Sequence, residues 1–449
     1  MDIEGYAKRG LLGNDPALEE KLTDRILEIK NIPRARAEEI ARVTILEAQA
    51  TLHLKGEILT PIMAGVTMGE FGVGSRGAGD FYAHEKIAEV IGKTDAVVDS
   101  SHLDDSGVVR VSGEGQYIVM NIDGTHSRLS DFPFLAGFHV ARAALRDIYV
   151  MGASPVALLS DIHVADDGDV GKIFDHIAGI SAVAELTGVP LVTGSTLRIG
   201  GDMVIGERMT RGVGAVGVAR DLTARIAAEP GDTILMTEGA GGGTISTAAL
   251  YYGMHEIVDE TINIKFIDAC EALIDADLLG RIHAMTDVTN GGIRGDAKEI
   301  SRTARVKLRF FEDKLHPLVN KKVFSMLETL KIDYLGVSLD ALLLIAPPDA
   351  APDIMNAIRA RGVAVDMVGE VVEGTGAELI YGGEVHDFTP RFRESAYTPI
   401  KKLVGDIAPE DYAGMQAAID RAATDAVGKK ERVVARIGRE ILDRELFGR

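Results

Sequence analysis

The chain has 449 residues, of which 48 are basic and 68 acidic, and its formal net charge at pH 7 is −20. This charge repels nucleic acid and anionic membranes, and no basic cluster longer than a pair offsets it, so we expect neither as a partner. Cys270 is the single cysteine, and no run of 18 apolar residues occurs. Together with an N-terminus that lacks an apolar signal segment, these features predict a cytoplasmic protein.

The first half of the chain predicts a helical extension followed by an α+β unit. Residues 16 to 55 have the pattern of two helices separated by Pro33, because proline ends a helical pattern. Strand-like runs such as "QYIVMNID" then precede "LAGFHVARAALRDIYVMG", whose period fits a buried helix. We therefore expect a helical extension at residues 1–56 and an α+β domain at residues 57–222.

The second half predicts another α+β domain and a helical tail. The Pro-Gly turn, strand and glycine loop of "EPGDTILMTEGAGGG" resemble a fresh domain start, so we place the second domain at residues 223–393. The tail, residues 394–449, is helical, with an apolar stripe that must pack somewhere. The stripe consists of Met415, Ile419, Ala423, Val434, Ile437 and Ile441.

The stretch "GVGSRGAGD", Gly72 to Asp80, fits the dinucleotide-binding spacing G-x-G-x-x-G. That fingerprint requires a buried strand running into the glycines, and the preceding "ILTPIMAGVTMGEF" is interrupted by a proline. What remains is a glycine-rich loop before a helix, which suits an anion because backbone N–H groups and the helix dipole face it. The alternative is a mobile surface loop.

Three carboxylate sites stand out along the first domain. Asp104 and Asp105 precede a strand, Asp123 ends an apolar strand, and Asp147 lies in an otherwise apolar helix. A turn explains the first pair equally well, and Arg142 or Arg146 could neutralise Asp147 in a salt bridge. Read with the glycine loop, the three sites indicate Mg²⁺ joined to a nucleotide.

The order of six motifs resembles the aminoimidazole-ribonucleotide synthetase (PurM-like) superfamily, across roughly residues 65 to 385. The motifs are "DDSGVV", "NIDGTHS", "ARAALRDIYVMGASPVALL", "VPLVTGST", "GDTILMTEGAGGG" and "TDVTNGGIRG". "LRDIYVMGASP" is the most specific of them. The superfamily includes selenophosphate synthetase, thiamine-monophosphate kinase and the hydrogenase-maturation factor HypE.

The resemblance implies a two-domain PurM-like fold, a homodimer formed through the first sheet, and ATP bound near the dimer interface. It also implies an ATP-dependent phosphoryl transfer that activates an oxygen of a small-molecule or protein-bound acceptor, catalysed largely by positioning. Asp104, Asp105, Asp123 and Asp147 match the Mg²⁺–ATP carboxylates. The remaining ATP contacts implied are Gly72, Gly74, Ser75, Arg76, Gly77, Thr193, Gly194 and Ser195.

The chain departs from its relatives at several points. Ser195 stands where many members carry an acidic residue, the chain ends without the cysteine of HypE, and the Cys and Lys of selenophosphate synthetase are absent. These departures keep open a non-catalytic nucleotide-binding assembly protein that uses its helical ends to hold a partner. No catalytic residue can be assigned. The candidate acid/base groups are His126, His139, His163 and His283, and Asp161 is a candidate substrate contact.

Overall fold

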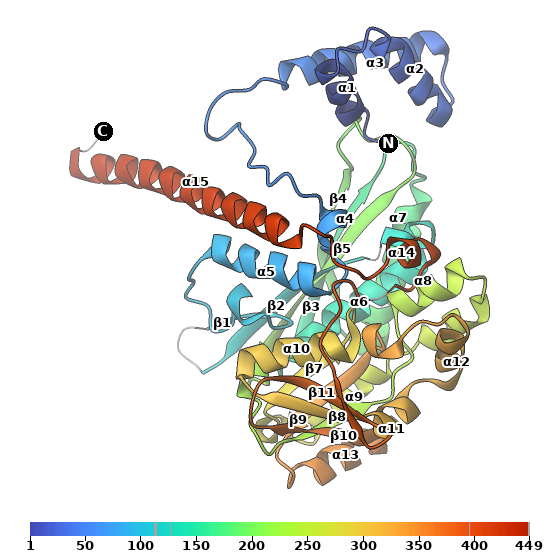
Figure 1. The fold of residues 1–449 in the computed structure, drawn as a ribbon, viewed down its shortest axis with the longest axis vertical. Coiled ribbons are helices and arrows are strands. Elements are labelled where there is room, and N and C mark those ends of the chain that lie inside the picture. Colours follow the sequence, from blue (N-terminus) through green and yellow to red (C-terminus); the bar gives the residue numbers. More distant parts are fainter. Residues whose placement is uncertain (112–114, 126, 395, 448–449) are drawn as a thin grey trace.

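Two sheets covered by helices form the body of the protein in the computed structural model, and a small helical unit stands at one end (Figure 1). The structure describes residues 1–111, 115–125, 127–394 and 396–447. This architecture confirms the expected α+β fold class with helical additions at both ends. None of the helices in these described ranges is both long enough and apolar enough to cross a bilayer.

The N-terminal unit contains three helices, α1 (Ile3–Leu12), α2 (Leu18–Ile29) and α3 (Arg34–Ala50). The two predicted helices are α2 and α3, with Pro33 at the N-cap of α3, and α1 is an addition that we did not predict. Leu22 and Ile26 are fully buried among the three helices. A β-bridge between Asp2 and Val204 attaches the unit to the first sheet domain.

The first sheet has five strands in the order β1-β2-β5-β3-β4, and all neighbours are antiparallel except β3 and β4. Helices α6 and α7 cover one face, while β4 is an exposed edge strand. α6 is buried on nearly every side, as its apolar composition predicts. The bounds are β1 Gly107–Arg110, β2 Tyr117–Gly124, α6 Pro133–Tyr149, β3 Ser154–Val164, α7 Gly171–Thr187, β4 Leu191–Arg198 and β5 Met209–Ala219.

The second sheet has seven strands in the order β12-β11-β8-β10-β6-β9-β7. Its strand β9 is completely buried, and one apolar core continues from this sheet to α6 of the first domain, so the two domains share an interior. Cys270 lies buried on α9, as expected for a small packed side chain. The strands are β6 Thr233–Thr237, β7 Ala284–Val288, β8 Lys307–Phe311, β9 Ala341–Ala346, β10 Val365–Val372, β11 Gly376–Tyr381 and β12 Glu384–Asp387. The helices are α8 Gly243–Tyr251, α9 Lys265–Asp275, α10 Gly292–Ala304, α11 Glu312–Leu315, α12 Lys321–Thr329 and α13 Ala351–Ala360.

After β12 the chain returns to the first domain as a C-terminal arm that ends in α14 (Pro399–Val404) and α15 (Tyr412–Phe447). The long helix α15 lies along α5 (Ala78–Ile91) and extends beyond the body (Figure 1). Ala423 is buried there, but the prediction was wrong for Val434 and Ile437, which are 64% and 47% exposed. They lie in the C-terminal half of α15, which extends beyond the body (Figure 1), and the side chain of Ile441 lies outside the described residues.

Candidate functional site

A cavity of about 960 Å³ lies where the first domain, the second domain and the glycine loop meet. Its wall includes the end of β2, the middle of α6, the turn after β7, and the loop between α4 (Met68–Phe71) and α5. This volume suits a nucleotide-sized ligand. Eight acidic side chains and only three arginines line it: Asp80, Asp104, Asp105, Asp123, Asp147, Asp287, Glu299 and Asp340, with Arg76, Arg146 and Arg225.

The four predicted carboxylates all line this cavity, although they come from three separate segments. Asp104 and Asp105 precede β1, Asp123 is near the end of β2, and Asp147 lies on α6. The fold therefore brings together residues that are up to 43 positions apart in the sequence, and their role as Mg²⁺–ATP ligands stays a prediction.

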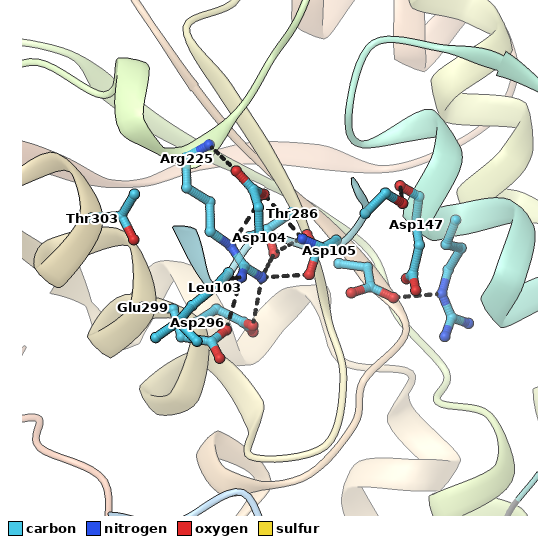
Figure 2. A network of polar contacts seen from close by, with 12 residues as sticks. Leu103, Asp104, Asp105, Asp147, Arg225, Thr286, Asp296, Glu299 and Thr303 are labelled. Atoms are coloured by element: carbon cyan, nitrogen blue, oxygen red, sulfur yellow. Dashed lines mark hydrogen bonds and ion pairs between the residues drawn. The ribbon is translucent and has the colours of Figure 1, made fainter. Parts of the chain in front are cut away.

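Asp104 and Asp105 are tied to Arg225, which begins a short 3-10 turn after β5 (Figure 2). Asp104 Oδ2 accepts a hydrogen bond of 3.0 Å from the backbone N–H of Arg225. Asp105 Oδ1 lies 2.6 Å from Arg225 Nη2, and its Oδ2 accepts from Thr286 Oγ1 at 2.9 Å. The side chain of Asp104 is only 1% exposed. The side chain of Asp105 is 6% exposed, so it is the better placed of the two to meet a ligand.

Arg225 also joins this carboxylate pair to α10 of the second domain. Its Nη1 lies 2.9 Å from Glu299 Oε2, and its Nη2 lies 3.8 Å from Asp296 Oδ1 (Figure 2). The Arg225 side chain is 1% exposed, and burial of so many carboxylates around one guanidinium fixes the relative position of the two domains at the site.

Asp147 is not neutralised by either of its neighbouring arginines, contrary to the salt-bridge alternative. Its Oδ2 accepts a 2.8 Å hydrogen bond from Asn121 Nδ2 on β2. Arg142 pairs with Asp340, and Arg146 pairs with Asp340 at 2.6 Å and with Asp287 at 2.9 Å. The arginines thus hold carboxylates of the second domain, and Asp147 faces the cavity.

The carboxylates that face the cavity have raised pKa values. Burial raises the pKa of Asp105 to about 7, which Arg225 opposes and Asp287 reinforces. Burial likewise raises the pKa of Asp123 to about 6, against the opposing charge of Arg146. For Asp147, burial and repulsion by Asp287, Asp123 and Asp105 raise the pKa well above its usual range. A bound cation would favour the ionised form of these carboxylates and offset the repulsion between them.

The donor set fits Mg²⁺ in its chemistry. Mg²⁺ prefers oxygen ligands and usually combines one or two carboxylates with phosphates and water. Within the described ranges, no group of three or more His, Cys, Asp or Glu side chains is arranged to hold a metal by itself. The residues that could contribute carboxylate oxygens are Asp105, Asp123 and Asp147, with phosphate completing the coordination.

The glycine loop contributes Gly74 and Arg76 to the cavity wall, whereas Gly72, Ser75 and Gly77 flank it. Gly72 and Gly74 have φ angles of +76° and +83°, which glycine adopts without strain. Asp80 Oδ1 accepts from the N–H of Gly74 at 2.9 Å, and Asp80 Oδ2 accepts from that of Arg76 at 2.7 Å. Two N–H groups that we expected to meet phosphate are thus bonded to a carboxylate of the chain itself.

The structure places Thr193, Gly194 and Ser195 away from this cavity. They lie in the exposed edge strand β4 and line a separate pocket of about 250 Å³ beside α7. Within one chain these residues lie apart from the carboxylates of the cavity. Their contribution to ATP binding stays a prediction, and it would require a second subunit that brings them to the site.

Only one of the candidate histidines in the described residues lines the cavity. Burial, with the charge of Arg142, lowers the pKa of His139 to about 3, and His139 Nε2 lies 2.9 Å from Ser246 Oγ. His139 is therefore a neutral hydrogen-bonding group in the core. His163 contacts Asp161 on β3, and His283 contacts Asp232, both outside the cavity wall. His126 lies outside the described residues.

Sequence reasoning did not assign roles to several second-domain residues at the site. The motif "TDVTNGG" was noted, yet its Asp287 and Asn290 were not recognised as cavity residues, and neither were Thr244, Glu299 and Asp340. Asp287 had a detectable signal, because it lies near the end of the fully buried strand β7, where a charged residue needs a partner.

The fold and the acid-lined cavity define a two-domain PurM-like protein. Residues 103–219 match the N-terminal domain of AIR synthase related protein, and residues 229–382 match its C-terminal domain. An uncharacterized protein of Methanocaldococcus jannaschii is 52% identical over 450 residues, which cover 97% of this chain and 98% of that protein. The chain belongs to the AIR synthase related family, and the predicted superfamily is confirmed.

Two further similar proteins have names that state an activity or a ligand. A selenide, water dikinase of Geobacter metallireducens is 32% identical over 240 residues, which cover 51% of this chain and 66% of that protein. The solved structure of the hydrogenase maturation protein HypE in complex with ATP matches with a TM-score of 0.53 and 19% identity, covering 64% of this chain and 88% of that chain. The structural match supports the shared fold.

Proposed function

We propose that the protein is an ATP-dependent, Mg²⁺-requiring enzyme that transfers a phosphoryl group to an oxygen of an acceptor and so phosphorylates or activates it. The acceptor is an amide, a carboxylate or a phosphate, carried by a small molecule or a protein. The observation that carries the proposal is the excess of acidic over basic side chains in one nucleotide-sized cavity. A triphosphate enters such a cavity only with cations that neutralise both partners.

Some side chains on the cavity wall would bind the cation, and others would orient the groups that bind it. Asp105, Asp123 and Asp147 would present oxygen ligands, and Mg²⁺ bound there would neutralise charge on the triphosphate. Arg225 and Arg146 hold the surrounding carboxylates in place through bonds of 2.6 to 2.9 Å. Because the site is partly closed by both domains, these charges act in a medium less polar than water, where positioning and charge stabilisation are most effective.

The relatives support the nucleotide but not one acceptor. The names of the selenide, water dikinase and of the HypE complex mention a dikinase reaction and ATP, respectively. Neither name fixes the acceptor of this chain, and we leave its identity to a screen.

Nucleotide binding and turnover test this proposal separately. Calorimetric titration of ATP with MgCl₂, and again with EDTA, should show binding only with Mg²⁺, and release of ADP should increase with one class of amides or acids. Binding without turnover on any acceptor would favour the non-catalytic assembly protein. No binding with Mg²⁺ would contradict both. Asp349→Asn, at an 84% exposed side chain in the second domain, is the control variant.

We also propose that the protein is a homodimer through the outer face of the first sheet. The face opposite α6 and α7 exposes an apolar group from four strands: Val109, Met120, Ile122, Val156 and Val218. Ile122 alone is 75% exposed. An apolar face of this kind on one sheet marks an interaction surface, and the same face on a second copy is self-complementary. Docking there would also cover part of β4, including Ser195.

A further inference from the structure

We propose that Asp80 is a positioning residue for the nucleotide site. Its carboxylate fills the anion-binding backbone of the glycine loop and thereby holds Arg76 at the cavity wall, so that the loop meets phosphate through the Arg76 guanidinium instead of through its N–H groups. This inference rests on the proposed ATP-binding function. It assigns the loop a different mode of contact from the one that its glycine spacing predicts.

The carboxylate of Asp80 lies inside the loop, where it is only 2% exposed. Its two oxygens accept from the N–H groups of Gly74 at 2.9 Å and Arg76 at 2.7 Å. The imidazole Nε2 of His84 lies 3.7 Å from Asp80 Oδ1, too far for a hydrogen bond. The loop backbone and the first turn of α5 therefore stabilise this negative charge, as they would stabilise a phosphate.

The neighbouring N–H groups of the loop are also bonded within the chain. Val73 N–H donates to Met68 O at 3.0 Å, and Ser75 N–H donates to Gly72 O at 3.2 Å. A phosphate that used this backbone would first have to displace Asp80, and the displaced carboxylate would then face a second anion. Repulsion between the two makes that arrangement unfavourable.

Arg76 is held in a conformation that lets it span the two domains. Its φ angle is +51°, a value that residues other than glycine rarely adopt, and its N–H bond to Asp80 accompanies this geometry. Its Nε donates to Asn290 O at 3.1 Å, and its Nη1 lies 3.3 Å from Glu299 Oε1. The side chain remains 24% exposed and lines the cavity.

The C-terminal arm supports the loop from outside, which makes the loop a preformed element. Glu394 N–H donates to Ser75 O, and Ala78 N–H donates to Arg391 O, both at 3.1 Å. A methyl group on Gly77 would lie 2.1 Å from Phe392 O, so the arm backbone packs directly against the loop. With Asp80 inside and the arm outside, the side chain of Arg76 is the part of the loop that presents a positive charge to the cavity.

Hydrogen exchange of the wild-type protein distinguishes the two modes of contact. We expect the amides of Gly74 and Arg76 to be protected without nucleotide, and saturating Mg²⁺–ATP to change their exchange less than twofold. In Asp80→Asn without nucleotide, exchange at both amides should accelerate at least fivefold, because a neutral amide is a weaker acceptor. Fast exchange in the free wild type that slows tenfold with Mg²⁺–ATP would overturn the proposal.

A double-mutant cycle tests whether Asp80 acts through Arg76. Asp80→Asn and Arg76→Gln should each weaken Mg²⁺–ATP binding about tenfold, and the double variant should bind no more weakly than about twofold below either single variant. Additive losses of about a hundredfold would overturn the positioning role, as would unchanged binding in Asp80→Asn. Asp420→Asn, which removes the carboxylate bonded to Tyr82 on α5, is the control and should bind normally. A wild type that binds no nucleotide would instead refute the proposed function.

Discussion

Arg225 Nη2 lies 2.6 Å from Asp105 Oδ1, and both side chains are almost completely buried, at 1% and 6% exposure. The two residues are 120 positions apart, so this contact links the segment before β1 to the start of the second domain. Because Arg225 also contacts Glu299, its guanidinium holds a cavity carboxylate and the second domain together. The site and the domain interface therefore depend on the same side chain.

Replacing Arg225 should destabilise the protein strongly. Arg225→Met leaves several buried carboxylates without their cation, which should lower the free energy of unfolding by about 3 to 5 kcal/mol. Urea unfolding followed by circular dichroism measures the change. Arg281→Met, which breaks exposed ion pairs with Asp349 and Asp353, is the matched control and should cost about 1 kcal/mol or less. Equal effects in both variants would contradict the central role of Arg225.

The pKa values of the cavity carboxylates predict a pH-dependent effect of neutralising them. The pKa of Asp123 is raised to about 6 in the folded protein, so the stability associated with its protonation is present below pH 4 and is lost as pH rises through 6. Without cations, Asp123→Asn should match the wild type near pH 3.5 and exceed its free energy of unfolding at pH 8 by about 2 to 3 kcal/mol. Urea unfolding in EDTA at the two pH values measures this difference, and a variant less stable than the wild type at pH 8 would contradict it.

Binding of Mg²⁺–ATP should favour the wild type over the Asn variants, because a cation binds the ionised carboxylates. Asp123→Asn and Asp147→Asn should each weaken Mg²⁺–ATP binding by about tenfold or more at pH 8, an effect of about 1.4 kcal/mol or more. Calorimetry gives the affinities, and circular dichroism should show unchanged folding. The control Asp349→Asn should bind like the wild type. If both cavity variants retain full affinity, the carboxylates are not the cation ligands.

The exposed face of the first sheet should control the oligomeric state. Met120→Glu together with Val218→Glu places charges in the proposed dimer interface and should raise the dimer dissociation constant at least a hundredfold, because unpaired charges are costly to bury. Sedimentation velocity at micromolar concentration measures this. Val385→Glu is the control, since Val385 is 64% exposed on β12 of the other sheet. A wild type that sediments as a monomer would remove the proposed interface.

The sequence was informative where a local pattern limits the fold. Asp147 in an apolar helix and Asp123 in an apolar strand are conspicuous, because burial of a charge requires a partner. Their convergence on one cavity was therefore predictable in outline. The helix after the glycine loop and the break at Pro33 followed from turn and helix chemistry in the same way.

The remaining features depend on contacts between distant parts of the chain. Nothing near Arg225 in the sequence indicates that Asp105 and Glu299 surround it, since these residues meet only after both domains form. The glycine spacing gave no sign that Asp80 fills the loop, because a phosphate and a carboxylate satisfy the same N–H groups. Likewise, the motif around Ser195 could not reveal that β4 is an exposed edge.

Two glycines of the loop should respond differently to the same substitution. Gly74 has a φ angle of +83° but open space around it, so Gly74→Ala should cost about 1 kcal/mol from backbone strain alone. Gly77 has an ordinary φ angle, yet its new methyl group would lie 2.1 Å from Phe392 O. Gly77→Ala should therefore push the C-terminal arm from the loop, which costs about 2 kcal/mol or more.

Thermal unfolding and limited proteolysis together separate these two effects. The arm around residues 388–412 should be cleaved faster in Gly77→Ala, because its backbone bonds to Ser75 and Ala78 are lost. Cleavage in Gly74→Ala should match the wild type, because strain at Gly74 leaves those bonds intact. If Gly77→Ala unfolds like the wild type and its arm resists protease, the arm does not hold the loop, and the glycine at position 77 has another explanation.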